Sequence, residues 1–570
     1  MIPVWTFSIG ELNMSRTLLP LLLLLLLPLP GPLAVSGAEP YDLLIRHGRI
    51  VDGTGNPWFY ADVAILDDRI VAIGKLDNAE AVRTIDAKGL VVAPGFIDMH
   101  SHSDFLLLED GKAQSKIRQG VTTEVLGEGN SAGPYQGKLS PRRTQVGEET
   151  VELRTLGDYF DTIDRAGTST NVCSYVGLNN IWQSVMGTTF DRPTPRQIKQ
   201  MQELVDRVMR DGAMGLSSQV MMPPGSLATT DDLVALCKAV APHGGIYSTH
   251  IRNEGTGVFD SVKEAIAIGE RAGVAVDIIH LKIADQQFWG RMDEVIALIE
   301  NARSRGVNVQ ANVYPYTRGN NNLVSIIPPW AHEGGRGELV KRLKDSKLRE
   351  RMKRDIKRGS DGWYNHYTAV GGDWSRMLVS GNNQYRGLTM DRVMSLRTQG
   401  RKNVDLLDEL FDLLIEEGGS VGTVYAHHEE SDMNLVLSQP WCSVGSDGSA
   451  YSIEGPLRRG NPHPRNFGTF PRVLGFYVRE RKLLALEDAV RKITSLNAAK
   501  IGIGDRGLLK RGYFADVTIF DADKIIDRAT YTEPFQYNEG VEFVIVNGEV
   551  VLERGNHTGA RPGRTIRKHR

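Results

Sequence analysis

The sequence predicts an α/β protein: a (β/α)8 TIM-like barrel with a small β-sandwich built from both chain ends. Eight short apolar runs recur through the middle of the chain, most of them followed by an amphipathic helical pattern. Alternating, strand-like segments flank this region on both sides. Eight strands that alternate with helices are typical of a closed parallel barrel, whose functional groups gather at the C-terminal ends of the strands.

The N-terminus, residues 1–38, is expected to be a signal peptide. Arg16 precedes a leucine run that ends at Leu27, and Ser36 and Ala38 occupy the positions expected beside a cleavage site. The apolar run is short and interrupted by prolines, so we do not expect it to span a membrane. The sequence therefore predicts an exported protein, periplasmic or secreted, with no membrane span after signal removal.

Composition narrows the range of partners. The formal net charge is −2 over 570 residues, which does not favour nucleic acid or an anionic membrane as a partner. The three cysteines, Cys173, Cys237 and Cys442, are too few and too scattered for a disulfide framework or a CxxC zinc site. The oligomeric state stays open.

The two ends of the chain resemble each other in pattern. Residues 39–94 include DLLIRHGRIVDG and ADVAILDDRIVAIG, and residues 506–570 include ADVTIFDADKIID and VEFVIVNGEVVLERG. Each half is too short to bury much apolar surface alone, so we expect them to pair into one small domain. Two unrelated hairpins are the alternative. The basic tail ARPGRTIRKHR is expected to be solvated.

Residues 95–505 are expected to form the barrel. Its predicted strands are GFIDMH, VTTEVLG, NVCSYVG, MGLSSQ, GIYSTH, VAVDIIH, VNVQANV and WCSVGSD. Apolar residues at three-and-four spacing predict helices over Ile198–Arg210, Asp231–Val240, Val258–Arg271, Arg291–Ala302 and Leu484–Ile493. A polar, charged segment at about 334–401 separates the last two strands and is expected to be an insertion over the barrel mouth.

Ionisable residues lie at the C-terminal ends of several of these predicted strands. His100 and His102 are two positions apart, so they share one face at the end of the first strand. His250, His280 and Asp447 end the fifth, sixth and eighth strands. Singly, each could be a satisfied buried histidine or a helix-capping aspartate. Together they would meet at one rim, where buried polar groups are costly without a partner, and this convergence favours a metal site.

The arrangement resembles the amidohydrolase superfamily of metal-dependent hydrolase barrels, which carry HxH after strand one, histidines after strands five and six, and an aspartate after strand eight. The segments PGFIDMHSHSD, GVTTEVLGEG, YSTHIRNEG, NVYPYT and HPRNFGTFPRVLGFYVRE resemble its D-aminoacylase and N-acyl-D-amino-acid deacylase branch. The resemblance covers about residues 41–555, with the insertion least matched. It implies one or two Zn²⁺ ions as the cofactor. The partner it implies is a small molecule, either an N-acyl amino acid or a short peptide-like amide.

One turn departs from that branch, which carries a cysteine metal ligand after the second strand. Here the turn reads GEGNSAG, without a cysteine. We expect Glu128 to take this place, because a carboxylate can coordinate or bridge metal ions. Glu124 has the same strand parity but would lie a turn deeper, and it remains the alternative.

The resemblance implies hydrolysis of the amide bond of N-acyl-D-amino acids, which releases a carboxylate and a D-amino acid. Asp447 would take a proton from the attacking water, activated by zinc, and return it to the leaving amine. Lys282, Tyr314 and Arg465 resemble the residues of the branch that contact the substrate, and an arginine suits a two-point grip on a carboxylate.

Arg252 is a further candidate for substrate binding. It could instead pair with Glu254 as support behind His250. The adjacent His427 and His428 cannot both be ligands from a regular strand, and we expect them at the rim or on the surface of the insertion.

Two other function classes stay open. A cyclic-amide hydrolase of the hydantoinase or dihydroorotase kind shares the barrel and the HxH pair. Such enzymes usually carry a carboxylated lysine after strand four, where this sequence reads GAMGLSSQ. A non-catalytic binding protein on the same scaffold would need to lack the general base, yet Asp447 is present.

Overall fold

The computed structural model describes residues 40–359, 363–381 and 383–568. The predicted signal peptide, residues 1–38, lies outside the described residues. Within the described ranges, no helix combines the length and the apolar character that crossing a membrane requires.

Parallel strands form a closed barrel, as predicted. Neighbouring strands pair in register, for example β12 with β13 from Gly215 opposite Ile246 to Gln219 opposite His250. The ring closes where Ser101, beyond the first strand, pairs with Gly448, beyond the last. The barrel strands are β6 (Phe96–Asp98), β7 (Val121–Leu126), β10 (Asn171–Ser174) with β11 (Val176–Gly177), β12 (Gly215–Gln219), β13 (Ile246–His250), β14 (Ala275–Ile278), β15 (Val309–Val313) and β19 (Cys442–Val444).

The five helices predicted from apolar spacing are confirmed. In α5 (Pro195–Asp211), for example, Thr194 caps the first turn and Pro195 occupies the first helical position. The same helix buries Met201, Leu204 and Val205 on one stripe against the barrel. The other four are α6 (Thr230–Val240), α7 (Val258–Ala272), α8 (Met292–Ser304) and α16 (Leu486–Ile493). Additional helices around the barrel are α1 (Leu106–Glu109), α2 (Gln114–Ile117), α3 (Leu156–Ala166), α4 (Leu178–Met186), α14 (Glu430–Leu437), α15 (Arg465–Arg472) and α17 (Ser495–Ile501).

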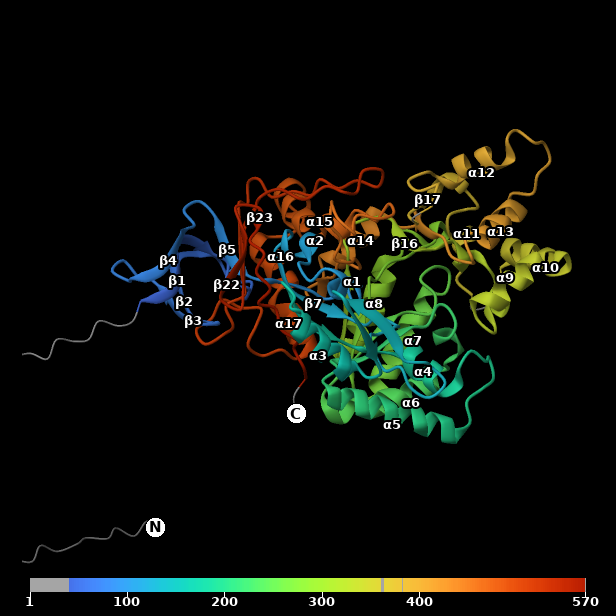
Figure 1. The fold of residues 1–570 in the computed structure, drawn as a ribbon, viewed down its shortest axis with the longest axis horizontal. Helices are drawn as coiled ribbons and strands as arrows, with labels where there is room; N and C mark the ends of the chain where they lie inside the picture. The colour runs from blue at the N-terminus through green and yellow to red at the C-terminus, as the bar shows by residue number, and fades with distance from the viewer. Residues whose placement is uncertain (1–39, 360–362, 382, 569–570) are drawn as a thin grey trace, which may run out of the picture. The chain divides into compact units, whose positions relative to one another are not determined.

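Both chain ends join one sheet of nine strands, so the expected pairing of the ends is present (Figure 1). The junction is antiparallel, with Val91 of β5 opposite Phe520 of β20. Side chains from both halves, such as Ile45 and Ile519, share one buried core. The strands are β1 (Tyr41–Ile50), β2 (Phe59–Leu66), β3 (Arg69–Gly74), β4 (Ala81–Asp86), β5 (Val91–Pro94), β20 (Val517–Phe520), β21 (Val541–Val546), β22 (Glu549–Glu553) and β23 (Asn556–His557).

The basic C-terminal tail is not a frayed end, and the expectation that it is solvated is wrong up to residue 568. Its backbone is bonded to the barrel: the amide of Gly563 donates to the carbonyl of Thr168, and that of Ile566 to Val172. Arg564 also pairs with Asp68 of the small sheet. These contacts satisfy backbone groups at the start of β10, which a solvated tail would leave to water.

The insertion between β15 and β19 has a hydrophobic core of its own. Buried members of this core run from Leu323 to Tyr425, a wider span than the predicted 334–401. The two ends of the insertion are apolar and include the short strands β16 and β18. The sequence therefore does not distinguish these ends from the barrel by their polarity. Its elements are β16 (Gly319–Asn322), α9 (Arg336–Lys344), α10 (Ser346–Arg358), α11 (His366–Ala369), β17 (Met377–Val379), α12 (Met390–Thr398), α13 (Leu406–Glu416) and β18 (Gly422–Tyr425).

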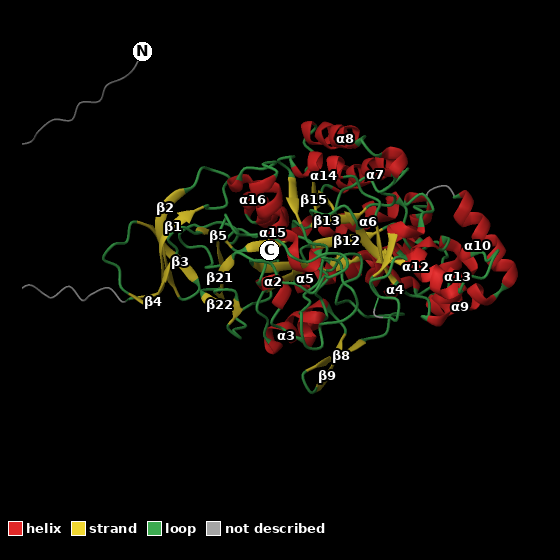
Figure 2. Ribbon diagram, turned by 90° about the horizontal axis from the view of Figure 1, so that it is seen from above, coloured by secondary structure: helices red, strands yellow, loops and turns green. Residues whose placement is uncertain are grey.

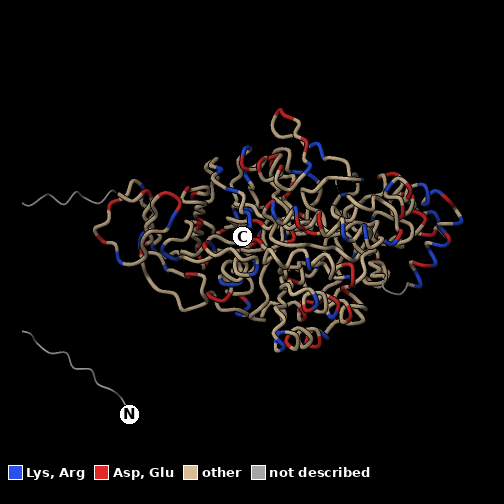
Figure 3. Tube along the Cα trace, turned by 90° about the horizontal axis from the view of Figure 1, so that it is seen from below, with Lys and Arg blue, Asp and Glu red and all other residues tan. Residues whose placement is uncertain are grey.

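The insertion helices α9, α10 and α13 lie at the end of the barrel away from β1–β4 (Figures 1 and 2). A separate hairpin, β8 (Arg142–Val146) with β9 (Glu149–Leu153), projects from the side of the barrel (Figure 2). Basic and acidic residues are interspersed along the trace, in keeping with the near-zero net charge (Figure 3).

The insertion is expected to lose stability in acid through His366. This side chain is 2% exposed, and burial lowers its pKa from 6.5 to about 3. The unfolded chain therefore binds more protons than the folded chain between about pH 6.5 and 3, and stability falls as the pH drops through that window. In His366→Gln the unfolding temperature should fall less steeply between pH 7 and about 4.5 than in the unmodified protein. This holds even if the substitution changes the unfolding temperature at pH 7.

The matched control for this experiment is His47→Gln, because His47 is exposed on the small sheet. Tryptophan fluorescence of Trp330 and Trp363 in the insertion would follow the transition. An unchanged pH slope in His366→Gln would show that His366 does not contribute to acid sensitivity.

Candidate functional site

The predicted ionisable residues lie at the C-terminal ends of their strands. Because the barrel strands are parallel, these ends meet at one rim. The structure brings to this rim His100, His102, Glu128, His250, His280 and Asp447, with possible ligand atoms in two groups that share Glu128. Within each group the ligand atoms lie within 4.8 Å of one another.

The first group joins the HxH pair to two carboxylates. Oε2 of Glu128 lies 2.8 Å from Nε2 of His100 and 3.0 Å from Nε2 of His102. Oδ1 of Asp447 lies 3.0 Å from Nε2 of His102 and 3.7 Å from Nε2 of His100. Four side chains from three strand ends thus surround one point.

The second group uses the other oxygen of the same glutamate. Oε1 of Glu128 lies 3.2 Å from Nδ1 of His250, which is 3.1 Å from Nε2 of His280. Glu128 therefore faces one group with each carboxylate oxygen, which is the geometry of a bridging ligand.

Two of these residues hold a strained backbone. His280 and Asp447 have φ values of 40° and 50°, in the left-handed region that disfavours side chains with a Cβ. Hydrogen bonds hold both in place: the amide of His280 donates to Oδ1 of Asn312, and the amide of Asp447 donates to the carbonyl of His100. Such strain is characteristic of functional positions, where the surrounding structure maintains it.

Glu124, the alternative to Glu128, lies below the site in the barrel interior. It is fully buried and accepts hydrogen bonds from the hydroxyls of Ser101, Ser103 and Thr170 at 2.6, 2.5 and 2.9 Å. With its oxygens already occupied by hydroxyl donors, Glu124 is not among the groups that could hold an ion, and Glu128 is.

Glu254 supports the second group, and the expectation that it pairs with Arg252 is wrong. One of its oxygens lies 3.0 Å from Nδ1 of His280 and also bonds the ammonium of Lys282, and the other lies 3.6 Å from Nε2 of His250. Orienting a histidine through its second nitrogen is the usual role of a carboxylate behind a metal ligand. The position of Glu254, four residues after His250, is the feature of the sequence that could have indicated this contact.

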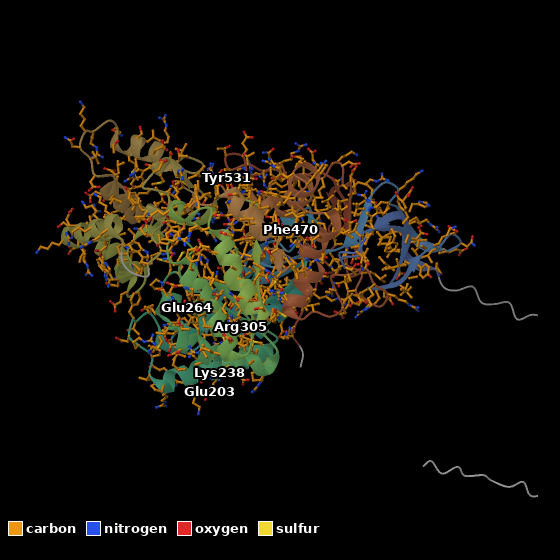
Figure 4. All side chains as sticks on the ribbon, turned by 180° about the vertical axis from the view of Figure 1, so that it is seen from behind. Glu203, Lys238, Glu264, Arg305, Phe470 and Tyr531 are labelled. Carbon is orange, nitrogen blue, oxygen red and sulfur yellow. The ribbon has the colours of Figure 1, made fainter. Side chains whose placement is uncertain are left out.

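Arg252 does not line the cavity above the possible metal ligands, so the structure does not support the prediction that it binds substrate. Its guanidinium makes two bonds of 2.9 Å to Glu264 and further bonds to the carbonyls of Ser226 and Ala228. Glu264 belongs to α7, on the helical exterior of the barrel (Figure 4). Because β13 ends at His250, the alternation of the strand no longer fixes the direction of a side chain two residues later.

The charge states suit metal binding. Burial opposes ionisation of Glu128, but His100 and hydrogen bonds from His102 and His250 hold its pKa well below the ordinary value. Burial likewise opposes ionisation of Asp447, whose pKa Arg465 and His100 hold down. Two buried carboxylates that stay ionised require positive charge between them.

The imidazoles supply the remaining donors. Burial, followed by the charge of Lys282, lowers the pKa of His280 to about 4, so its ring is neutral and able to donate a lone pair. Burial opposes protonation of His102 and His250, but Asp447 and Glu128 raise the pKa of His102 to about 10, and Glu254 and Glu128 raise that of His250. These two rings would therefore release a proton when a metal binds. Neutral imidazoles with carboxylates are the donor set that zinc favours at sites with an open position. The residues present therefore fit a zinc site, with one or two ions.

A cavity of about 320 Å³ lies above these groups. It is lined by His102, Glu128, His250, His280, Asp447 and Arg465, and on the insertion side by Asn320, Asn321 and Ser380. Arg465 is 3% exposed, its Nη1 lies 2.7 Å from Oδ2 of Asp447, and its Nε has no hydrogen-bond partner among the described residues. A buried guanidinium with an unused donor fits an anionic ligand group.

Lys282 and Tyr314 lie in the adjoining wall. They line a narrow recess of about 10 Å³ that shares His280 with the main cavity. The guanidinium of Arg465 stacks 4.7 Å above the ring of Tyr314, while the ammonium of Lys282 is held by Glu254. Arg465 thus faces the cavity directly, and the other two stand behind it.

His427 and His428 are not at the surface, contrary to expectation. They are 3% and 8% exposed, and burial lowers the pKa of each well below its ordinary value. The ring of His427 stacks on Tyr425, and that of His428 lies beside Tyr314. Both rings pack between the insertion and the barrel. Their burial depends on this tertiary contact, which the local sequence does not indicate.

Known proteins resemble this chain over most of its length. The model of the amidohydrolase family matches residues 83–288 and 433–552. The chain is 33% identical to a D-aminoacylase of Alcaligenes xylosoxydans xylosoxydans and 32% identical to an N-acyl-D-glutamate deacylase of the same organism. Each alignment covers 93% of this chain, and 98% and 97% of the respective relative.

A solved structure agrees with these matches. The N-acyl-D-glutamate deacylase of Bordetella bronchiseptica, complexed with zinc and a phosphonate that mimics the tetrahedral intermediate, superposes with a TM-score of 0.76. It is 30% identical in sequence, and the match covers 93% of this chain and 100% of that one.

Proposed function

Since the chain belongs to the amidohydrolase family, we propose that it hydrolyses the amide bond of N-acyl-D-amino acids to a carboxylate and a D-amino acid. The observation that carries the proposal is the bridging position of Glu128 in the cavity that Arg465 enters. The D-aminoacylase and deacylase relatives act on substrates of this kind, as their names state.

His100, His102, Glu128, His250 and His280 would hold the metal, for which we propose zinc. The two groups around Glu128 leave room for one or two ions. When bound, zinc supplies Lewis acidity, which lowers the pKa of water and polarises the substrate carbonyl.

Asp447 is the residue we propose as general base and acid. Its carboxylate is ionised and lies at the rim of the cavity, 3.0 Å from His102. It would accept the proton of the attacking water as the C–O bond forms. It would then donate this proton to the amide nitrogen as the C–N bond breaks, so the amine leaves uncharged and one carboxylate serves both steps.

Arg465 would bind the substrate carboxylate. Its unused Nε–H, together with a second N–H, offers the fork that a carboxylate accepts, and burial keeps water from competing. Tyr314 fixes the plane of this guanidinium by stacking against it. Lys282 lies behind it, where Glu254 pairs with its ammonium and also holds His280.

We expect the zinc-loaded protein to hydrolyse N-acetyl-D-amino acids and to leave their L-enantiomers nearly untouched. A panel with both enantiomers, hydantoin and dihydroorotate, followed by amine release or ring opening, would measure this. Removing zinc with a chelator should abolish activity, and adding zinc back should restore it. Hydrolysis of the cyclic amides alone would instead establish a hydantoinase-like enzyme, and full activity in metal-free protein would contradict the mechanism.

A further inference from the structure

A second cavity of about 560 Å³ adjoins the one above the metal-binding residues. Gln219 lines both cavities. In β16, Asn320 and Asn321 line the first and Asn322 the second. The loop after β7 divides in the same way, with Glu128 at the first and Asn130 at the second. Because neighbouring residues of the same elements line both, the two cavities adjoin at Gln219.

Gln219 lies at this junction. It ends β12 and is half-buried, and its side-chain amide makes no hydrogen bond within the ranges that the structure describes. Gly129 packs directly against it: a Cβ at this position would lie 2.7 Å from Cβ of Gln219. A glycine at position 129 therefore lets the loop after β7 approach the end of β12 closely, where Gln219 faces both cavities.

The second cavity lies on the acyl side of the proposed substrate. Arg465, which would bind the substrate carboxylate, follows the eighth strand, β19, and the two residues behind it, Tyr314 and Lys282, follow the seventh and sixth strands, β15 and β14. The second cavity lies instead beside the second and fourth strands, β7 and β12. In a closed eight-stranded barrel these two arcs face each other across the mouth. A substrate held by its carboxylate at one arc therefore directs its acyl group toward the other.

The lining of the second cavity differs from that of the first. Its lining is mixed, and its polar residues are Asn130, Gln183, Thr188, Thr189, Gln219, Asn322, His332, Arg336 and Ser420. Barrel loops and the insertion add six apolar side chains, where the first cavity has only Tyr451 and Pro462: Phe190, Pro223, Pro224, Leu227, Val324 and Leu339. All but Leu339 are only half-buried, so they present apolar surface to the cavity. A space of this size is within the range of pockets that enclose whole small ligands, and an acetyl group would leave it unfilled.

We propose that this cavity binds the distal part of the acyl group, so that the preferred substrates are N-acyl-D-amino acids with an apolar chain of medium length rather than an acetyl group. The proposal rests on the proposed function. Burial of each methylene in an apolar site favours binding, so kcat/KM should increase with chain length until the cavity is full.

The test compares N-acetyl, N-octanoyl and N-glycylglycyl derivatives of one D-amino acid. For the unmodified protein we expect kcat/KM for the octanoyl substrate to exceed that for the acetyl substrate by at least about tenfold. In Leu227→Trp and Val324→Trp, which fill the cavity, this ratio should fall to about one. Leu396→Trp is the matched control, because Leu396 is 46% exposed on the outside of the insertion, and it should keep the ratio.

Equal kcat/KM values for the acetyl and octanoyl substrates in the unmodified protein would overturn this inference and leave the proposed function standing. A preference for the glycylglycyl substrate would overturn the assignment of an apolar chain. If none of the three D-substrates is hydrolysed, the proposed function fails together with the inference.

Discussion

Asp447→Asn is expected to lower kcat by about 1,000-fold while KM changes little. Asparagine keeps the shape of the side chain but cannot accept the proton of the attacking water, and general acid–base groups typically contribute about 100- to 10,000-fold. Because Asp447 also belongs to one group of possible metal ligands, kcat should be expressed per bound zinc. Steady-state kinetics with parallel metal analysis would give this number.

The control for this variant is Asp285→Asn. Asp285 is another buried aspartate, 4% exposed, whose carboxylate accepts a bond from the amide of Gln287 outside the site cavity. It should leave kcat within a few-fold of the unmodified protein. If Asp447→Asn retained more than about a tenth of kcat per zinc, the proton transfer would have to be assigned elsewhere.

The sequence predicts the barrel well because its signals are local. Each strand is a short apolar run, each helix has an apolar stripe, and strand order follows chain order in this fold. The same regularity explains why a histidine at the end of β13 can be paired with one at the end of β14 from the sequence alone. Parity along a strand places His100 and His102 on one face.

The features that the sequence does not predict depend on contacts between segments far apart in the chain or outside a regular strand. Arg252 lies two residues beyond the end of β13, and its partner Glu264 is on the following helix, so no local rule pairs them. The buried state of His427 depends on the insertion folding back over the barrel. The C-terminal tail is ordered by backbone bonds to β10, a partner that composition cannot reveal.

Glu128→Gln is expected to remove both metal binding and activity. The substitution keeps the size of the side chain but replaces one oxygen of the bridge with an amide nitrogen, which cannot donate a lone pair. It also removes the negative charge between the two groups of ligands. Since changes to outer partners of metal ligands already cost about 10- to 100-fold in affinity, loss of the shared ligand should cost at least as much. Zinc content after dialysis measures it.

Glu124→Gln, four residues earlier on the same strand face, separates this effect from a general loss of stability. Glu124 accepts three hydroxyl hydrogen bonds in the barrel interior, and an amide there would leave a buried group unsatisfied at a cost of about 1–3 kcal/mol. This variant should unfold at a lower temperature but bind zinc normally. The reverse result, in which Glu124→Gln loses zinc and Glu128→Gln keeps it, would assign the missing cysteine's position to Glu124, because metal content reports ligation independently of stability.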